Sequence, residues 1–351
     1  MLSRVSHILP LTTIRRARQL PCSGKILARS GQKISANDVI AEATLPSRHL
    51  MLDIERGLGL PAEKADELVQ PQPGDLVQEG EVLAGPVGIM SRVVRAPQSG
   101  RVVAVRGGRL LLELETTTIN VKAGFSGTVA ELIPDRGAYI EAVGSLVQGF
   151  WGNGRIDVGM ILMAVKKPDE EMTPDKLDVS MRGAVIVCGS CNRPEVLQAA
   201  ADMKLRALIF SSISSNLVGA AMQAPMPVMV LEGFGKLPYS TQVFKVLATS
   251  EKREGSINTA GWDRWKGSRP ELVVGLPVSN RPPLPRELDI IAPGQTVRVM
   301  QPNMKGRTAT VSSLNLEPVV MPSGLRVEAA LVKFENGDAA TIPLANLEVI
   351  G

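Results

Sequence analysis

The chain has 351 residues, a formal net charge of +4, 44% hydrophobic residues and only 3% aromatic residues. This length allows two or three domains, with cores packed mainly by Val, Leu, Ile, Ala and Met. The 33 Gly and 25 Pro are scattered along the chain, which favours many short strands and turns over disorder. The small net charge does not require a polyanionic partner.

Cysteine content and hydropathy favour a cytoplasmic protein. The three Cys lack the spacing of a disulfide framework, which indicates a reducing compartment. No run of about 18 apolar residues occurs, so we expect no membrane-spanning helix. Residues 1–22 lack the uninterrupted apolar stretch of a signal peptide, and we expect a frayed lead-in to the first strand.

Two segments of the N-terminal region match almost position for position. Gly31–Ala41 and Gly74–Ala84 share a turn Gly, an apolar residue three positions on, a second turn residue, an acid and an apolar pair. The second turn residue is Asn37 in one copy and Gly80 in the other. Because both residue types tolerate positive φ, we expect the same tight turn twice. A Ser-Gly-x-(Ile/Val) pattern, typical of a strand start, recurs at 23–26, 99–102 and 126–129.

These features resemble the biotinyl/lipoyl-like barrel-sandwich module. The resemblance implies that Gly31–Ala41 and Gly74–Ala84 fold together into one closed β body. Between them, the helical spacing of Leu50, Ile54, Leu58 and Leu60 predicts a helical insertion at residues 46–68. Members of the family that carry a cofactor attach it to a Lys at a hairpin tip, but the matching segment Gly88–Arg92 has none. Arg lacks the primary amine that biotin or lipoate needs, so we expect no cofactor.

A different pattern follows a charged, Pro-containing linker at residues 166–181. Apolar stretches at 184–188, 207–210 and 227–231 alternate with helical patterns at 194–203, 215–222 and 240–247. The alternation predicts an α/β domain over residues 182–280, with a parallel sheet covered on both faces. Its first helix should have Pro194 in the first turn and Asn192 as its cap.

One candidate for chemistry in this domain is the C-x-x-C motif Cys188-Gly189-Ser190-Cys191. It lies where a strand meets a helix, and a helix N-terminus can stabilise a thiolate. The placement resembles that in thioredoxin, although Val187 stands where that family has an aromatic residue. The favoured interpretation is that both Cys are buried as small apolar residues.

Two further candidates are a loop and an acidic turn. The loop Gly189–Pro194 has free amides that could hold a phosphate, but it lacks the Gly-Lys-Ser/Thr of a P-loop, and a simple capped helix is favoured. The acidic turn lies at the carboxyl end of a predicted strand, where open α/β sheets bind ligands. The candidate ligand-binding residues are Gly189, Ser190, Asn192, Glu232, Gly233 and Gly235.

Strands return at the carboxyl end. Gly294–Val299, Lys305–Val311 and the hairpin signal Asn336-Gly337 resemble a KOW-type, SH3-like barrel, expected over residues 287–351. KOW modules often occur on ribosomal and transcription proteins, so the resemblance implies RNA or a polymerase as partner. Basic residues are few for tight phosphate tracking. The candidate contacts to nucleic acid or a protein partner are Arg298, Lys305, Arg307, Trp262 and Trp265.

The sequence predicts a multidomain α+β protein with a barrel-sandwich-like β domain at 1–165, an α/β domain at 182–280 and an SH3-like barrel at 287–351. No metal-ligand spacing, paired-carboxylate motif or cofactor fingerprint stands out. We therefore interpret the chain as a non-catalytic adaptor or assembly scaffold with a protein partner. Two alternatives stay open: a nucleic-acid or transcription-associated binder, and a thiol-based redox enzyme at Cys188 and Cys191.

Overall fold

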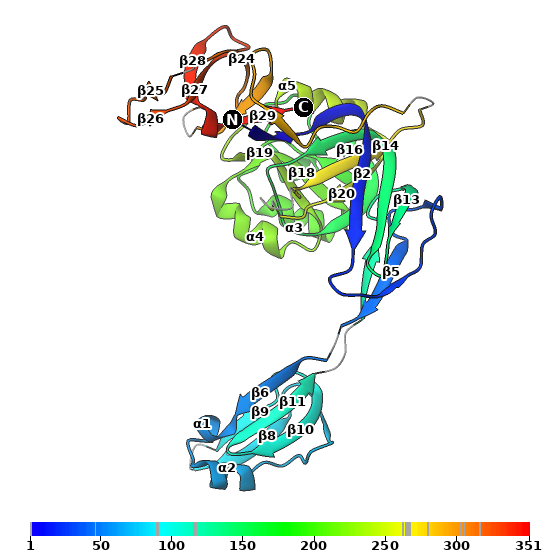
Figure 1. The fold of residues 1–351 in the computed structure, drawn as a ribbon, viewed down its shortest axis with the longest axis vertical. Coiled ribbons are helices and arrows are strands. Elements are labelled where there is room, and N and C mark those ends of the chain that lie inside the picture. Colours follow the sequence, from blue (N-terminus) through cyan, green and yellow to red (C-terminus); the bar gives the residue numbers. More distant parts are fainter. Residues whose placement is uncertain are drawn as a thin grey trace.

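The computed structural model describes residues 2–45, 47–88, 91–114, 118–261, 263, 268–278, 281–301, 304, 306–315 and 317–351. The protein is β-rich, with several sheets and short helices, which confirms the expected β-rich α+β class. Most elements gather in one large body, while residues 49–114 form a smaller body set apart from it (Figure 1). Within the described residues, no helix has the length and apolar content needed to cross a membrane.

The largest sheet has eleven strands and runs through the large body. One half contains four parallel strands: β16 (Ile156–Met163), β17 (Val185–Val187), β18 (Ala207–Ile213) and β19 (Val228–Phe234). The edge strand β15 (Trp151–Gly152) pairs antiparallel with β19. The other half is antiparallel: β20 (Glu254–Asn258), β21 (Glu271–Gly275), β14 (Gly137–Gln148), β13 (Gly127–Ile133), β4 (Lys33–Ile34) and β2 (Ile8–Gln19).

Helices cover both faces of the parallel strands, as the sequence pattern predicts. Helices α3 (Glu195–Asp202) and α4 (Val218–Gln223) pack on one face, where side chains such as Ile186 and Phe210 point. Helix α5 (Thr241–Thr249) packs on the other face, against Val187 and Ile209. Within the described residues, the 3-10 helices are η1 (Pro174–Lys176), η2 (Val179–Met181), η3 (Ser215–Leu217) and η5 (Leu344–Asn346).

Two details of the α/β region differ from expectation. Helix α3 begins at Glu195 after Pro194 and has no side-chain cap, so Asn192 does not cap it. The first parallel strand, β16, comes from residues assigned to the N-terminal β domain. Because β16 pairs with β17 on one side and β20 on the other, a single sheet crosses the expected boundary between residues 165 and 182.

The small body, here called the peripheral module, has its own core of buried residues that includes Ile54, Leu83 and Leu112. A four-stranded sheet and a hairpin enclose this core. The four-stranded sheet has the order β6 (His49–Asp53), β11 (Arg109–Leu114), β10 (Gly100–Arg106) and β7 (Leu76–Val77). The hairpin pairs β8 (Val82–Val87) with β9 (Arg92–Arg95), and the helices are α1 (Ile54–Leu58) and α2 (Ala62–Glu67). The expected helical insertion is thus a strand followed by two short helices.

Gly31–Ala41 and Gly74–Ala84 lie in different cores, so the expectation that they close one β body is wrong. The first segment belongs to the large body, where β5 (Val39–Thr44) pairs with β3 (Lys25–Ile26) and β12 (Thr118–Lys122). The second lies in the peripheral module, which is inserted between β5 and β12. The body that contains the second copy is therefore inserted into the part of the chain that forms the body of the first copy. We call the two copies nested in this sense.

The two copies nevertheless have the same hydrogen-bonded geometry. The Gly31 N–H donates to Val129 O at 2.8 Å, and the Gly74 N–H donates to Val102 O at 2.7 Å. The strand that starts at each Ser-Gly pairs in the same register, Gly127 with Ile34 and Gly100 with Val77. At the second turn, Gly80 has φ of 82°, whereas Asn37 is not among the residues with positive φ. The shared turn is thus made with two different backbone conformations.

The C-terminal sheet has seven strands. In order they are β22 (Leu288–Ile290), β1 (Leu2–Ser6), β29 (Leu347–Ile350), β23 (Thr296–Val299), β24 (Thr308–Leu314), β27 (Ala329–Phe334) and β28 (Ala339–Pro343), with a separate hairpin β25 (Val319–Val320) and β26 (Arg326–Val327). The predicted Asn336-Gly337 hairpin joins β27 to β28, and the Phe334 N–H donates to Asp338 O at 2.9 Å.

The start of the chain completes this C-terminal sheet. β1 pairs in parallel with β29, and the two chain ends lie close together (Figure 1). Val5 and Ile8 are buried, so the expectation of a frayed lead-in is wrong. The physical reason is long-range pairing: β1 and β2 acquire their partners from β29 and β14, far along the sequence.

Candidate functional site

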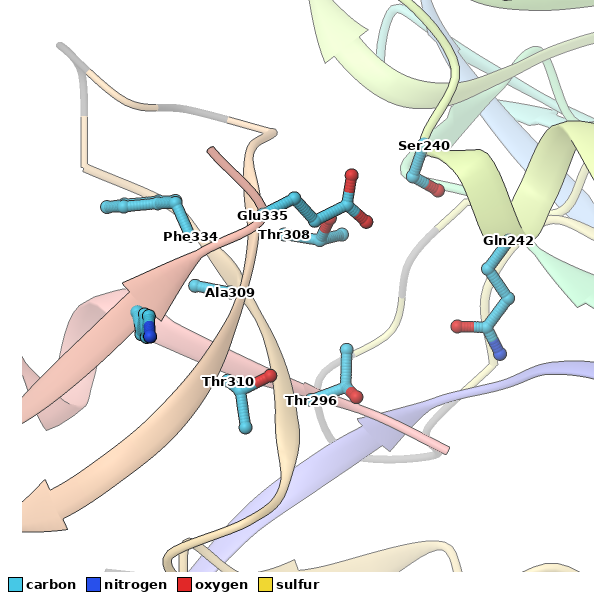
Figure 2. Close-up of a pocket in the computed structure, with 9 residues that line it drawn as sticks. Ser240, Gln242, Thr296, Thr308, Ala309, Thr310, Phe334 and Glu335 are labelled. Atoms are coloured by element: carbon cyan, nitrogen blue, oxygen red, sulfur yellow. The ribbon is translucent and has the colours of Figure 1, made fainter. Parts of the chain in front are cut away.

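A groove lies between the start of α5 and the C-terminal sheet. It consists of two adjoining cavities of about 290 Å³ each, which share Ser240, Thr308, Phe334 and Glu335. Figure 2 shows Ser240 and Gln242 on one side, with Thr308 and Glu335 on the other. Neither cavity has a Cys or His among its described lining residues.

Contacts with neighbouring residues fix polar groups on both walls of this groove. The Ser240 N–H donates to Glu232 Oε1 at 2.9 Å, while the buried Ser240 Oγ has no hydrogen-bond partner among the described residues. On the opposite wall, the Arg307 guanidinium lies 4.0 Å from the centre of the Phe334 ring. Arg307 is exposed, and its Nη2 lies 3.4 Å from Asn336 Oδ1.

Glu232 and Arg298, predicted for two different binding roles, form a buried ion pair with each other. Arg298 Nη2 lies 3.0 Å from Glu232 Oε2, and each side chain is 1% exposed. Arg298 Nη1 lies 3.5 Å from Leu231 O and 3.7 Å from Glu348 Oε2. Both charges are therefore paired inside the protein, where they join the α/β region to the C-terminal sheet. Among the described residues, Glu232 Oε2, Arg298 Nε and Arg298 Nη2 have no hydrogen-bond partner. Neither is placed to contact an external ligand or nucleic acid.

The loop predicted to hold a phosphate uses its amides within the fold. The Ser190 N–H donates to Glu170 O at 3.1 Å, and the Cys191 N–H donates to Ser212 O at 2.9 Å. A Cβ at Gly189 would approach Glu170 O to 1.6 Å, so this loop and the segment around Glu170 pack without space between them. Asn192 is exposed. The expectation of free amides is wrong for Ser190 and Cys191.

Hydrogen bonds to Glu170 stabilise the segment of residues 166–176, which packs against this loop. Its carboxylate accepts hydrogen bonds from Lys176 Nζ and from the Lys166 N–H, the latter at 2.8 Å. These bonds lower the pKa of Glu170 to about 2. The carboxylate thus stays charged at ordinary pH and keeps its bonds to Lys166 and Lys176. Backbone hydrogen bonds between Ser190 and the residues Glu170 and Met172 hold this segment on the loop.

The two thiols of the C-x-x-C motif are buried and unlike reactive thiols. Cys188 is 0% exposed and Cys191 is 2% exposed, and neither forms a disulfide. Burial raises the pKa of both thiols, and for Cys188 the raising is large. The thiolate that redox chemistry needs is therefore disfavoured at both positions.

Gly233 and Gly235 shape the chain rather than contact an open site. Gly233 has φ of 135° and pairs with Ser212, and Gly235 has φ of 110° and donates to Ile213 O at 2.9 Å. The turn that follows buries Tyr239. Its hydroxyl lies within hydrogen-bonding distance of the carbonyls of Cys188 and Ile209, and burial raises the pKa of the phenol well above its ordinary value.

Of the residues predicted to contact nucleic acid, the structure leaves one accessible. Arg307 is exposed at the groove, and Arg298 is buried. Trp262, Trp265 and Lys305 lie outside the described residues. In the described part of the chain, no group of three or more His, Cys, Asp or Glu is arranged to hold a metal ion.

An apolar stripe on the peripheral module was not predicted from the sequence. It crosses the outer face of the four-stranded sheet and consists of Met51, Leu111, Val103 and Ala104. Met51 is 61% exposed and Val103 is 40% exposed. The next row holds Leu76 on β7, which is 68% exposed. The sequence signal was the alternation of β6, which we interpreted as helical.

Charged side chains border the stripe on both sides. Strand register places Arg101 opposite Glu113 in one bordering row and Arg109 opposite Arg106 in the other. Asp53 lies opposite Arg109 at the end of the second row. An apolar centre with a polar border is the usual composition of a protein-protein interface.

No protein-family model matches this chain, and no curated protein matches its sequence.

Proposed function

We propose that the protein is a non-catalytic adaptor that binds a protein partner through the outer face of the peripheral module. The observation that carries the proposal is the apolar stripe on a body set apart from the rest of the molecule (Figure 1). Single exposed apolar side chains are ordinary on protein surfaces. A row that is continuous across three strands is less ordinary and favours a binding surface.

The border of the stripe favours an acidic partner. Arg101, Arg106 and Arg109 contribute three positive charges, against the two negative charges of Asp53 and Glu113. Complementary charge mainly directs encounter and orientation, while the apolar centre supplies most of the binding free energy. The proposed partner is therefore a protein surface with an apolar centre and an acidic border.

The sites first considered for chemistry support a non-catalytic role. Glu232 is paired with Arg298, the amides of Ser190 and Cys191 are bonded within the fold, and the Cys188 thiol is buried with a raised pKa. Each of these groups serves packing or the contact between sheets. Among the described residues proposed to contact nucleic acid, only Arg307 is exposed. Both thiols of the C-x-x-C motif are buried, which does not favour the redox alternative.

We also propose fold families for the parts. The matching turns and registers of the two nested copies support barrel-sandwich relationships for the peripheral module and its outer counterpart. The consecutive antiparallel pairing of β29, β23, β24, β27 and β28 and the Asn-Gly hairpin between the last two support an SH3-like barrel.

The test compares two variants of the full chain in quantitative pull-downs from the source cytoplasm. Met51→Glu combined with Leu76→Glu places charge on the proposed surface. Leu325→Glu serves as the matched control, because Leu325 is 64% exposed but lies between β25 and β26. We expect a partner retained by the wild type and the control and reduced at least tenfold by the double variant.

The purified partner must then bind wild-type protein directly, with an affinity that falls as Arg106 and Arg109 are replaced by Gln. Equal recovery with all variants would contradict the proposal. Nucleic acid as the only retained molecule would favour the binding alternative instead. Self-association lost in the double variant, with no other protein retained, would replace the partner with a second copy of the chain.

A further inference from the structure

Strand β6 is an open edge of the peripheral module. It lies at one end of the four-stranded sheet and, among the described strands, pairs only with β11. An unpaired edge is a template for a further strand, and proteins protect such edges with Pro, Lys, a bulge or a very short strand. β6 contains neither Pro nor Lys, has five residues, and pairs with β11 without a shift of register. The edge is therefore able to accept another strand.

The pairing with β11 determines which backbone groups of β6 point outward. In an antiparallel pair, every second residue directs its N–H and C=O at the neighbouring strand. Two hydrogen bonds fix this pattern at the ends of β6: the Leu114 N–H to Arg48 O and the Ile54 N–H to Gly108 O, each at 2.8 Å. Leu50 and Leu52 thus face β11, whereas His49 and Met51 direct their backbone groups away from the sheet. Among the described residues, no backbone hydrogen bond outside the β6–β11 pairing involves His49 or Met51.

The sequence of β6 matches itself when a second copy runs antiparallel along this edge. A two-fold axis at Met51 places the Met51 residues of the two copies opposite each other. They form a hydrogen-bonded pair, since both direct their N–H and C=O outward. On the other face of the sheet, the half-buried Leu50 is then opposite the half-buried Leu52 of the second copy. At each end of the joint, His49 is opposite Asp53.

The polar ends of β6 select this register. Within its own sheet, His49 lies beside Glu113, and Asp53 lies beside Arg109. In the joined sheet the His49 imidazole therefore lies between two carboxylates, one from each copy, and an imidazole N–H can donate to either. A shift of two residues in either direction would instead place Met51 opposite Asp53 or His49. Only the centred register pairs apolar with apolar and polar with polar residues.

We propose that two copies of the chain pair antiparallel along β6, with the two-fold axis at Met51. The axis is perpendicular to the sheet, so the apolar stripes of both copies lie on the same face and meet at Met51. The pairing uses the edge of the sheet and leaves its outer face open. It therefore does not depend on the adaptor function.

Disulfide cross-linking of the purified full chain tests the register. Cys22 is replaced by Ser in all variants, because the other two Cys are buried. Opposite Cα atoms in a hydrogen-bonded antiparallel pair are about 5.5 Å apart, which a disulfide can span. Under mild oxidation, Met51→Cys should give a linked dimer at least ten times faster than His49→Cys, whose two copies lie at opposite ends of the joint. Mixing His49→Cys with Asp53→Cys should restore rapid linkage.

Sedimentation velocity of the chain without added cysteines measures the pairing itself. The wild type should dimerise with increasing concentration. His49→Asp places two carboxylates opposite each other at both ends of the joint and should weaken the dimer at least tenfold. Adding Asp53→Asn should recover most of this loss, and Asn still caps helix α1. Leu325→Glu is the control and should not change the dimer.

A wild type that stays monomeric at its highest soluble concentration would overturn the proposal. Equal rates of linkage for Met51→Cys and His49→Cys would also overturn it, because they indicate random collision rather than a fixed register. A dimer unaffected by His49→Asp would do the same, since it would use another surface. Recovery of a different protein through the apolar stripe is a separate measurement, so either proposal can fail without the other.

Discussion

Arg298 and Glu232 are the charges that connect the α/β region to the C-terminal sheet. Both side chains are 1% exposed, and Arg298 also lies near Leu231 O and Glu348. Removing a charge from water is costly, and the pair compensates for this only while both partners are present. The contact between the two regions should therefore respond more to the loss of one partner than to the loss of both.

Arg298→Met should lower the free energy of unfolding by about 3–5 kcal/mol, because Glu232 is left as an unpaired buried charge. The double variant Arg298→Met with Glu232→Leu should recover most of that loss. Urea unfolding of the full chain measures both effects. Arg307→Met is the control, since Arg307 is exposed, and it should change stability by less than about 1 kcal/mol. A double variant less stable than the single one would contradict this account.

The thiols at Cys188 and Cys191 allow a kinetic prediction. Burial favours the protonated form and raises both pKa values, so little thiolate forms as pH rises through the ordinary range near 8.5. We expect N-ethylmaleimide at pH 7.5 to modify the half-buried Cys22 first and Cys188 only on unfolding. Mass spectrometry after timed quenching measures the order. Rapid modification of Cys191 in the folded protein would instead favour the redox alternative.

Residue types alone could not show which groups surround Arg298, Glu232 and the two thiols. Val297-Arg298-Val299 predicts a strand correctly, but the sequence does not show whether Arg298 points to solvent or to another sheet. The same holds for Glu232, which was predicted just after a strand at 227–231 and lies within β19, and whose partner was not predicted. In both cases the missing information is a contact between distant parts of the chain.

The nested motif copies show how equivalent elements tolerate different residues. In each copy an acid accepts a hydrogen bond from a backbone N–H three residues before it, Asp38 from Ser35 at 2.8 Å and Glu81 from Gln78 at 2.7 Å. At the second turn, Gly80 has positive φ, where an added Cβ is unfavourable, and Asn37 does not. No atom lies within 4 Å of such a Cβ, so the effect of a substitution there is purely conformational.

Gly80→Ala should therefore lower the free energy of unfolding of the peripheral module by about 1–2 kcal/mol. Asn37→Ala, at the matching position, should cost less than about 0.5 kcal/mol, because Asn37 is exposed and does not have positive φ. Hydrogen exchange of amides in β7 and β8 measures the first effect, and that of amides in β4 and β5 the second. Equal costs at the two positions would contradict the assigned turn geometry.

Local patterns predicted some elements and not others. The strands β17, β18 and β19 could be predicted from continuous apolar stretches, because each strand is buried on both faces. β1 and β2 were missed, since their partners lie in β29 and β14. β6 was predicted as helix because Leu50 and Ile54 have helical spacing, although the chain changes from strand to helix between them.

At the scale of the whole molecule, each body is built from segments that are far apart in the sequence. The first strand completes the last sheet, and the peripheral module is an insertion inside the N-terminal region. The repeat pattern indicated two related copies, but not that one copy would have its own core. The candidate site was predicted least well, because the apolar stripe appears only when β6, β11 and β10 are side by side.

The most direct test of the adaptor function is site-specific photo-crosslinking in cells that contain the full chain. A photoreactive residue replaces Met51 on the stripe or, as control, Val179, which is 75% exposed in η2. We predict one dominant adduct with another protein from position 51, reduced when Arg106 and Arg109 are replaced by Gln, and no such adduct from position 179. Absence of a protein adduct at position 51, or the same adducts from both positions, would contradict it.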